Sequence, residues 1–98
     1  MNNSDYRYVI IEVIAAPFEA SRHKIRAKPL ANQGYDDDMR MECPTSIRKE
    51  ANIGSLYKVW AKVKDTDLKP QLFTSYHWAP EPISRKEATA FIKARRWR

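Results

Sequence analysis

The chain has 98 residues, of which 43% are hydrophobic and 31% charged, and it contains two glycines. This length has room for one domain with a single core, and the composition is typical of a folded chain, so we expect residues 1–98 to form a single domain with no disordered tail. The net charge is +6, and because basic and acidic residues balance up to Glu50, the whole excess lies in the remaining half. This asymmetry favours an anionic partner, either nucleic acid (DNA or RNA) or an acidic protein, although many small domains use Lys and Arg only for solubility.

The single cysteine, Cys43, cannot form a disulfide within the chain, and no Cys/His cluster has the spacing of zinc ligands. The sequence therefore favours a reducing, cytoplasmic environment and predicts no metal or other cofactor. The longest apolar run, residues 8–16, is interrupted by Glu12 and is too short to span a bilayer. Because the first residues also lack the basic segment of an export signal, we expect no membrane insertion.

Residues 6–14 have the alternation of a β-strand. Val9, Ile11 and Val13 would lie on one face, and Tyr8, Ile10 and Ile14 on the other. Because both faces are apolar and rich in β-branched residues, we expect a central strand. Pro17 then breaks the pattern, as a connection between strands should.

Residues 22–28 alternate strictly between basic and other side chains. The basic positions, which would share one face of a strand, are Arg22, Lys24, Arg26 and Lys28. The pattern predicts a strand with a cationic face. A short helix opened by Pro17 is the alternative, since Pro29 suits an edge strand and a helix end equally well.

The middle of the chain has the weakest pattern. Gly34 and the three acids at 36–38 predict a turn that leads into a short strand at 39–43. Pro44 would end this strand. Residues 45–52 fit a helical turn or a loop equally, and Gly54 closes the segment.

Two further strands, at 55–64 and 71–78, are predicted to form a hairpin. In the first, Tyr57, Val59, Ala61 and Val63 lie on one face, and Lys58, Trp60, Lys62 and Lys64 lie on the other. The register that we expect pairs Val63 with Leu72, Lys62 with Phe73 and Lys58 with His77.

A stiff linker bounded by Pro80 and Pro82 should precede a C-terminal helix at 84–95. Ser84 and Glu87 form an S-x-x-E capping box, which satisfies free amides at a helix start. The helical period places Ala88, Phe91 and Ile92 on the buried side, and Arg85, Lys86, Thr89, Lys93 and Arg96 on the outer side. The order of the elements predicts an α+β fold, a curved antiparallel sheet or small open barrel of about five strands with this helix packed on it.

The candidate functional site is a surface that combines cations with aromatic side chains. Phosphates attract Lys and Arg through counterion release, and a flat aromatic ring can stack on an unpaired base. Trp60, which stands between two lysines, fits that chemistry. The predicted nucleic-acid-binding residues are Arg22, Lys24, Arg26, Lys58, Trp60, Lys62, Lys93 and Arg96. The alternative is that the helix or another chain covers Trp60 and that the lysines are a solvated strand face.

Three groups of residues raise the question of catalysis. Cys43 with His23 or His77 would resemble a thiolate and its base, but a cysteine before a proline at a strand end is typical of a small buried residue. The acids at 36–38 suggest a magnesium site, although a solvated turn explains them as well. Glu12 has apolar neighbours that predict partial burial, and a buried carboxylate needs a basic partner.

We therefore expect a small, non-enzymatic binding module, monomeric or weakly dimeric, that contacts nucleic acid through its Lys/Arg/Trp surface. A protein-interaction or accessory subunit domain is the alternative, with Trp60 as an interface anchor. A small metal-dependent nuclease that uses Asp36, Asp38 or Glu12 is a third hypothesis.

Overall fold

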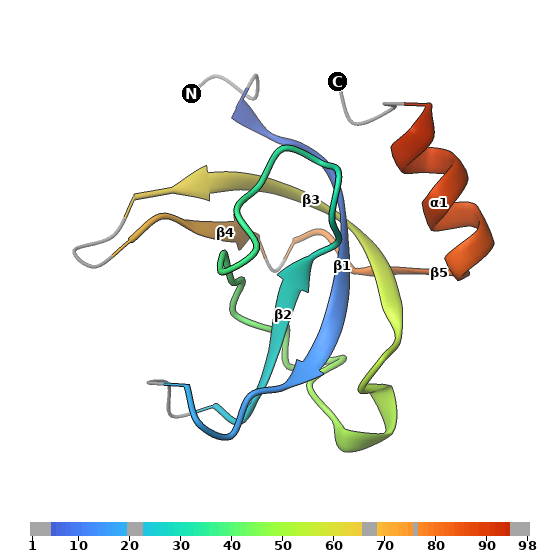
Figure 1. The fold of residues 1–98 in the computed structure, drawn as a ribbon. Coiled ribbons are helices and arrows are strands. Elements are labelled where there is room, and N and C mark those ends of the chain that lie inside the picture. Colours follow the sequence, from blue (N-terminus) through green and yellow to red (C-terminus); the bar gives the residue numbers. More distant parts are fainter. Residues whose placement is uncertain (1–4, 20–22, 66–68, 76, 95–98) are drawn as a thin grey trace.

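The computed structural model describes residues 5–19, 23–65, 69–75 and 77–94, and the structural statements below concern these residues. Within them the chain forms a five-stranded antiparallel sheet, curled into a half-barrel, and one α-helix (Figure 1). The elements are β1 (Arg7–Ala15), β2 (Ile25–Pro29), the 3-10 turn η2 (Glu50–Asn52), β3 (Leu56–Lys64), β4 (Gln71–Thr74), β5 (Glu81–Ile83) and α1 (Arg85–Lys93). This is the α+β architecture that the sequence predicts.

Strand β1 lies at the centre of the sheet, as its two apolar faces indicate. It pairs with β2 on one edge and with β3 on the other, and the strands follow the order β2-β1-β3-β4. Val9, Ile11 and Val13 point to the inner, concave face, where none of the three side chains is exposed to solvent. Ile10, on the opposite side of the same strand, belongs to a second, smaller core.

The connection between β2 and β3 closes the inner face. It contributes Met39, Met41, Cys43 and Ile47 to the larger core, against Val59, Ala61 and Leu72 of the sheet. Met41 forms an antiparallel bridge with Ala27 of β2 and a parallel bridge with Leu72 of β4. The connection thus spans the two open edges of the half-barrel and brings it close to closure.

The predicted strand at 39–43 is wrong, although its side-chain alternation is right. Met39, Met41 and Cys43 are buried while Arg40 and Glu42 are not, but the backbone bridges to its neighbours only at Met41. The segment crosses from β2 to β4 and follows neither strand, so it has no extended ladder.

The fifth strand instead lies in the predicted linker. Glu81–Ile83 pairs with β3, opposite Leu56–Lys58. β5 is a three-residue strand at the edge of the sheet, where Pro82 needs no hydrogen bond to a further strand. The prediction of a stiff linker at this position was therefore wrong.

Other boundaries also differ from the sequence patterns. β2 runs from Ile25 to Pro29, with Ile25 and Ala27 toward the inner core, so the alternative of a short helix here was wrong. β4 ends at Thr74, four residues before the predicted end, because the chain leaves β3 there. The predicted pairs of Val63 with Leu72 and Lys62 with Phe73 are confirmed. The expected pair of Lys58 with His77 is wrong, since Glu81 of β5 occupies the position opposite Lys58.

Gln33 completes the hydrogen bonding of β1 beyond the end of β2. Its side chain is 2% exposed, and its amide nitrogen donates to the carbonyls of Ile10 and Leu30, at 2.8 and 3.0 Å. Its amide oxygen accepts from the backbone N–H of Ile10 at 2.8 Å. Positive φ angles at Asn32 and Gly34 form the tight turn that directs the side chain inward. No sequence pattern indicated this role.

Helix α1 begins as predicted. The Ser84 side chain accepts from the Glu87 backbone N–H, the Glu87 side chain accepts from that of Ser84, and both halves of the capping box are present. Ala88 is fully buried against Ile10 and Leu56, with Phe91 and Ile92 packed beside it, so the predicted apolar stripe is confirmed. The helix therefore lies on the outer face of the sheet (Figure 1). No helix in the described part of the chain is long and apolar enough to cross a bilayer.

Candidate nucleic-acid interface

The part of the outer face that adjoins α1 carries four aromatic side chains in contact. Trp60 of β3 lies opposite Tyr8 of β1, with their ring centroids 4.8 Å apart, and stacks on Tyr6 at 6.0 Å with an interplanar angle of 13°. Tyr6 also meets Trp78 at 5.4 Å and 58°. Offset and tilted arrangements of this kind are the favourable geometries for aromatic pairs. Residues far apart in the sequence thus form one continuous aromatic cluster.

Two lysines of β3 lie over these rings. The Nζ of Lys58 is 5.0 Å from the centroid of Tyr8 and 5.7 Å from that of Phe91, and the Nζ of Lys62 is 5.2 Å from that of Tyr6. Both distances to the tyrosines are within the range of cation-π attraction, which orders a lysine that would otherwise be mobile. We call this set the aromatic-lysine surface, and its members are Tyr6, Tyr8, Lys58, Trp60, Lys62 and Trp78.

The rings remain partly open to solvent. Tyr8 is 44% exposed and Trp78 is 41% exposed, whereas Trp60, between Tyr6 and Tyr8, is half-buried. Tyr6 and Tyr8 therefore shield Trp60 in part, and the rings of Tyr8 and Trp78 are more exposed than that of Trp60. A planar ligand would meet Tyr8 and Trp78 before it met Trp60.

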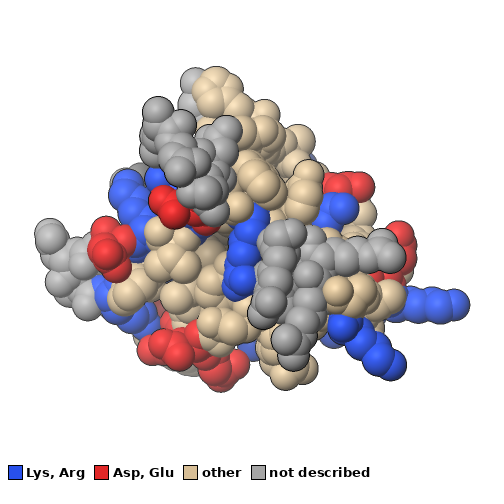
Figure 2. Space-filling model, turned by 90° about the horizontal axis from the view of Figure 1, so that it is seen from above, with Lys and Arg blue, Asp and Glu red and all other residues tan. Residues whose placement is uncertain are grey.

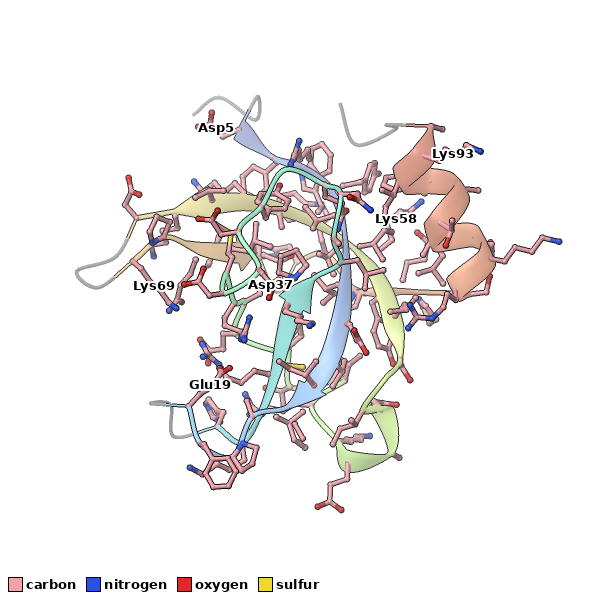
Figure 3. The ribbon with its side chains drawn as sticks, viewed as in Figure 1. Asp5, Glu19, Asp37, Lys58, Lys69 and Lys93 are labelled. Carbon is pink, nitrogen blue, oxygen red and sulfur yellow. The ribbon has the colours of Figure 1, made fainter. Side chains whose placement is uncertain are left out.

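Intramolecular ion pairs reduce the charge that this face offers. Lys58 Nζ lies 3.4 Å from the Glu81 carboxylate, at positions that β3 and β5 pair directly. In Figure 3 the Lys58 side chain lies between β1 and α1. Exposed pairs of this type are weak, so an anion can compete for the lysine. Lys62 lies beside Tyr6, and no carboxylate among the described residues forms an ion pair with it.

The basic residues of β2 lie elsewhere. Arg26 is opposite Ile14 of β1, six residues from Tyr8, which places it about 20 Å along the strand from the aromatic cluster. Arg26 forms an ion pair with Glu19 at 2.8 Å, and Arg40 forms a second one at 2.9 Å. Hydrogen bonds from these two side chains, the larger contribution from Arg40, hold the pKa of Glu19 below its usual value. Figure 3 shows Glu19 beside β2, far from Lys58.

The predicted set of binding residues thus separates into groups. The structure brings Lys58, Trp60 and Lys62 together, and it leaves Lys24 and Arg26 apart from them. Lys93, at the end of α1, projects away from the sheet in Figure 3 and borders a hollow of about 490 Å³ between α1 and residues 30–32. Arg22 and Arg96 lie outside the described residues. In Figure 2 basic side chains appear at several separate places with acidic ones between them, and they form no continuous stripe on that face.

A larger cavity of about 530 Å³ opens next to the aromatic-lysine surface. Residues 41–46 and 48 form one wall, and residues 72–75 and 78–80 form the other. Trp78 belongs to both features, since it lines the cavity and contacts Tyr6. The outer face and the cavity therefore share one side chain.

Several of the residues that raised the question of catalysis are buried or paired with a charged neighbour. Cys43 is 2% exposed, and burial raises the pKa of its thiol to about 11, so it is protonated and a poor nucleophile at neutral pH. His23 lies 3.6 Å from Glu42, and Lys69 lies 3.4 Å from Asp38 in the acidic turn. Glu12 is half-buried and stands opposite Lys28 of β2 in the strand register, and no ion pair joins these two side chains. Within the described ranges no three metal-ligating side chains gather into a group.

Comparison with known proteins adds no assignment: no family model, curated protein or solved structure matches this chain. The sequence singled out Lys58, Trp60 and Lys62 by their alternation but missed the tyrosines and Trp78. The missing signal is the register of β1 on β3, because Tyr8 becomes a neighbour of Trp60 only through that pairing.

Proposed function

We propose that this protein binds single-stranded nucleic acid on the aromatic-lysine surface. The observation that carries the proposal is the direct contact between lysines and partly exposed rings, with Lys58 over Tyr8 and Lys62 over Tyr6. Lysines release counterions from phosphates, and aromatic faces stack on unpaired bases. A paired base hides its faces within the duplex, so the rings favour a single strand.

The same geometry defines what each residue would contribute. Lys62 is the better phosphate contact, because Lys58 must first leave Glu81. Tyr8 and Trp78 offer accessible ring area for stacking, while Trp60 holds Tyr6 and Tyr8 in place from between them. Lys24, Arg26 and Lys93 are too dispersed to form part of one short contact and would add only long-range attraction.

The test is fluorescence anisotropy with a labelled single-stranded oligonucleotide at about 50 and about 200 mM salt. We expect measurable affinity at the lower salt, weaker affinity for a duplex, and a steep loss at the higher salt. Lys62→Glu should weaken binding about five- to tenfold and reduce the slope of log K against log salt by about 0.7 or more, since one phosphate contact is lost.

Lys49→Glu is the matched control. Lys49 is exposed and precedes η2, at the opposite end of the molecule from the aromatic cluster (Figure 1), so the same charge change there should cost much less affinity. Absence of binding by the wild type at low salt would overturn the proposal. Equal losses of affinity in the Lys62→Glu and Lys49→Glu variants would show that binding is only a non-specific attraction by net charge.

An interface with an acidic protein is the second candidate. Lys58 and Arg26 already have carboxylate partners within the chain, and half-exposed Tyr and Trp side chains are common anchors of protein interfaces. Self-association through this face would show as a mass that rises with concentration in sedimentation. A constant monomer mass together with oligonucleotide binding would favour nucleic acid.

A further inference from the structure

The cavity beside the aromatic-lysine surface arises from the way in which β3 shares one edge between two strands. β4 pairs with residues 61–64 of β3 and β5 pairs with residues 56–58, so the chain leaves the sheet between Thr74 and Glu81. The carbonyl of Trp60, at the gap, accepts a hydrogen bond of 2.8 Å from the Thr74 hydroxyl. Residues 78–80, residues 72–75 and the facing residues 41–46 and 48 enclose the space of about 530 Å³.

The backbone of β4 also faces this space. Leu72 N–H points away from β3 and donates to the carbonyl of Arg40 at 3.0 Å. Because backbone orientation repeats every second residue along a strand, the N–H and C=O of Thr74 point to the same side, and Thr74 is a lining residue of the cavity. The cavity wall thus presents a backbone donor and acceptor next to apolar side chains.

The lining has the character of a site for a flat, partly polar ligand. Met41 and Leu72 are buried at its base, and the partly exposed rings of Phe73 and Trp78 border it. Thr45 and Arg48 add a hydroxyl and a guanidinium group. A volume of a few hundred Å³, mostly apolar walls and a few placed polar groups are the usual properties of small-ligand sites.

Charge at the rim favours an anionic ligand. Arg48 is half-buried and lines the cavity, with its Nη1 3.4 Å from the Cys43 carbonyl. Lys64 does not line the cavity, but its Nζ lies 5.2 Å from the ring centroid of Phe73, which does. The thiol of Cys43 is neutral and adds no charge of its own. Glu42 is the acidic member of the lining, and it is directed to His23 at 3.6 Å.

We propose that this cavity takes one nucleobase, with Phe73 and Trp78 against its faces or edges, the Thr74 backbone at its polar edge, and Arg48 near its phosphate. The inference that this base belongs to a bound strand rests on the proposed function. Trp78 connects the cavity to the aromatic-lysine surface, where that strand would bind. The outer face would then supply affinity for any strand, and the cavity would select one base.

The first experiment is a titration of the isotope-labelled protein by NMR, with adenosine 5′-monophosphate and ribose 5-phosphate as probes. The two probes share a phosphate and a sugar, and the base distinguishes them. We expect the adenosine probe to shift the amide signals of Phe73, Thr74 and Ser75, and ribose 5-phosphate to leave them in place. Equal effects of both probes, or shifts centred on Tyr8 and Trp60, would overturn the proposal.

The second experiment fills the cavity. Ala79→Trp adds a large side chain at an exposed position of the lining, and Ala90→Trp adds the same side chain on α1, outside it. The first substitution should lower the affinity for the adenosine probe at least tenfold, and the second should leave it unchanged. If circular dichroism shows that Ala79→Trp does not fold, Arg48→Gln provides the test instead. It should lower the affinity for the adenosine probe about threefold, whereas the control Arg85→Gln should not lower it.

Oligonucleotide binding separates this proposal from the previous one. If the wild type binds the oligonucleotide but not the monophosphate, and Ala79→Trp changes nothing, the cavity proposal fails and the aromatic-lysine surface stands. If the monophosphate binds and Ala79→Trp abolishes it while no oligonucleotide binds, the cavity stands and the proposed function fails. If both hold, Ala79→Trp should weaken oligonucleotide binding without the change of salt slope that Lys62→Glu produces.

Discussion

The two faces of the sheet are built from the same strands by the same alternation, yet they have different roles. On the inner face Val9, Ile11 and Val13 are fully buried, since the connection between β2 and β3 covers them. On the outer face α1 covers Ile10, but Tyr8 is left 44% exposed. The inner face is thus packed against its own chain, whereas part of the outer face stays open to solvent. Exposure of large rings has a cost in aggregation, and the lysines placed over them offset it.

The largest expected effect is on the free energy of unfolding, and it comes from making the same Ile→Ala substitution on the two opposite faces of β1. Ile11→Ala should lower the free energy of unfolding by about 4 kcal/mol, because Ile11 is fully buried and its neighbours cannot fill the space. Ile14→Ala, on the half-buried outer side, should cost about 1 kcal/mol. Urea denaturation measures both. Similar losses would show that the outer side of β1 is as tightly packed as the inner side.

The next largest effect on stability is expected at Gln33, because its side chain forms hydrogen bonds with backbone groups of β1 beyond the end of its pairing with β2. Gln33→Met keeps the length of the side chain but leaves the buried N–H of Ile10 without its acceptor, which should cost about 2–3 kcal/mol. Gln71→Met, at a half-buried position of β4, is the control and should change stability by less than about 0.5 kcal/mol. A neutral Gln33→Met substitution would mean that water or a shifted backbone replaces the amide.

The smallest effect depends on pH and concerns Cys43 on the inner side. Its folded-state pKa is raised from 9.0 to about 11, so folding favours the neutral thiol. This contribution is complete below pH 9 and is lost as the pH rises through 11, by about 2 kcal/mol at pH 11. Wild type should therefore lose more stability than Cys43→Ala between pH 8 and pH 11 in chemical denaturation. Parallel pH profiles for the two proteins would show that the thiol is accessible to solvent.

The sequence predicted those parts of the fold whose signals are local. Alternation of Val9, Ile11 and Val13 marked a central strand, and the spacing of Ser84 and Glu87 marked the start of α1. β5 was not predictable in this way, because a three-residue strand with a proline at its centre has no periodicity. Its existence depends on the edge of β3 that β4 leaves open.

The candidate site was also predictable only where its signals are local in the sequence. Alternation within β3 placed Lys58, Trp60 and Lys62 on one face, but it gave no information about distance to other strands. Lys24 and Arg26 have equally clear alternation, yet the register of β2 places them far from Trp60, and Glu19 neutralises part of their group. Composition identifies charge, whereas only tertiary pairing determines which charges act together.

The divided edge of β3 has a consequence for how the chain can vary in length. β4 and β5 each have their own register on β3, so neither depends on the number of residues in the connection between them. Residues added to or removed from this connection would change the depth and width of the cavity and would move Trp78, but they would not displace α1 or the part of the aromatic-lysine surface that β1 and β3 carry. The shape of the cavity is thereby uncoupled from the integrity of the sheet, and this connection is the natural place to change it.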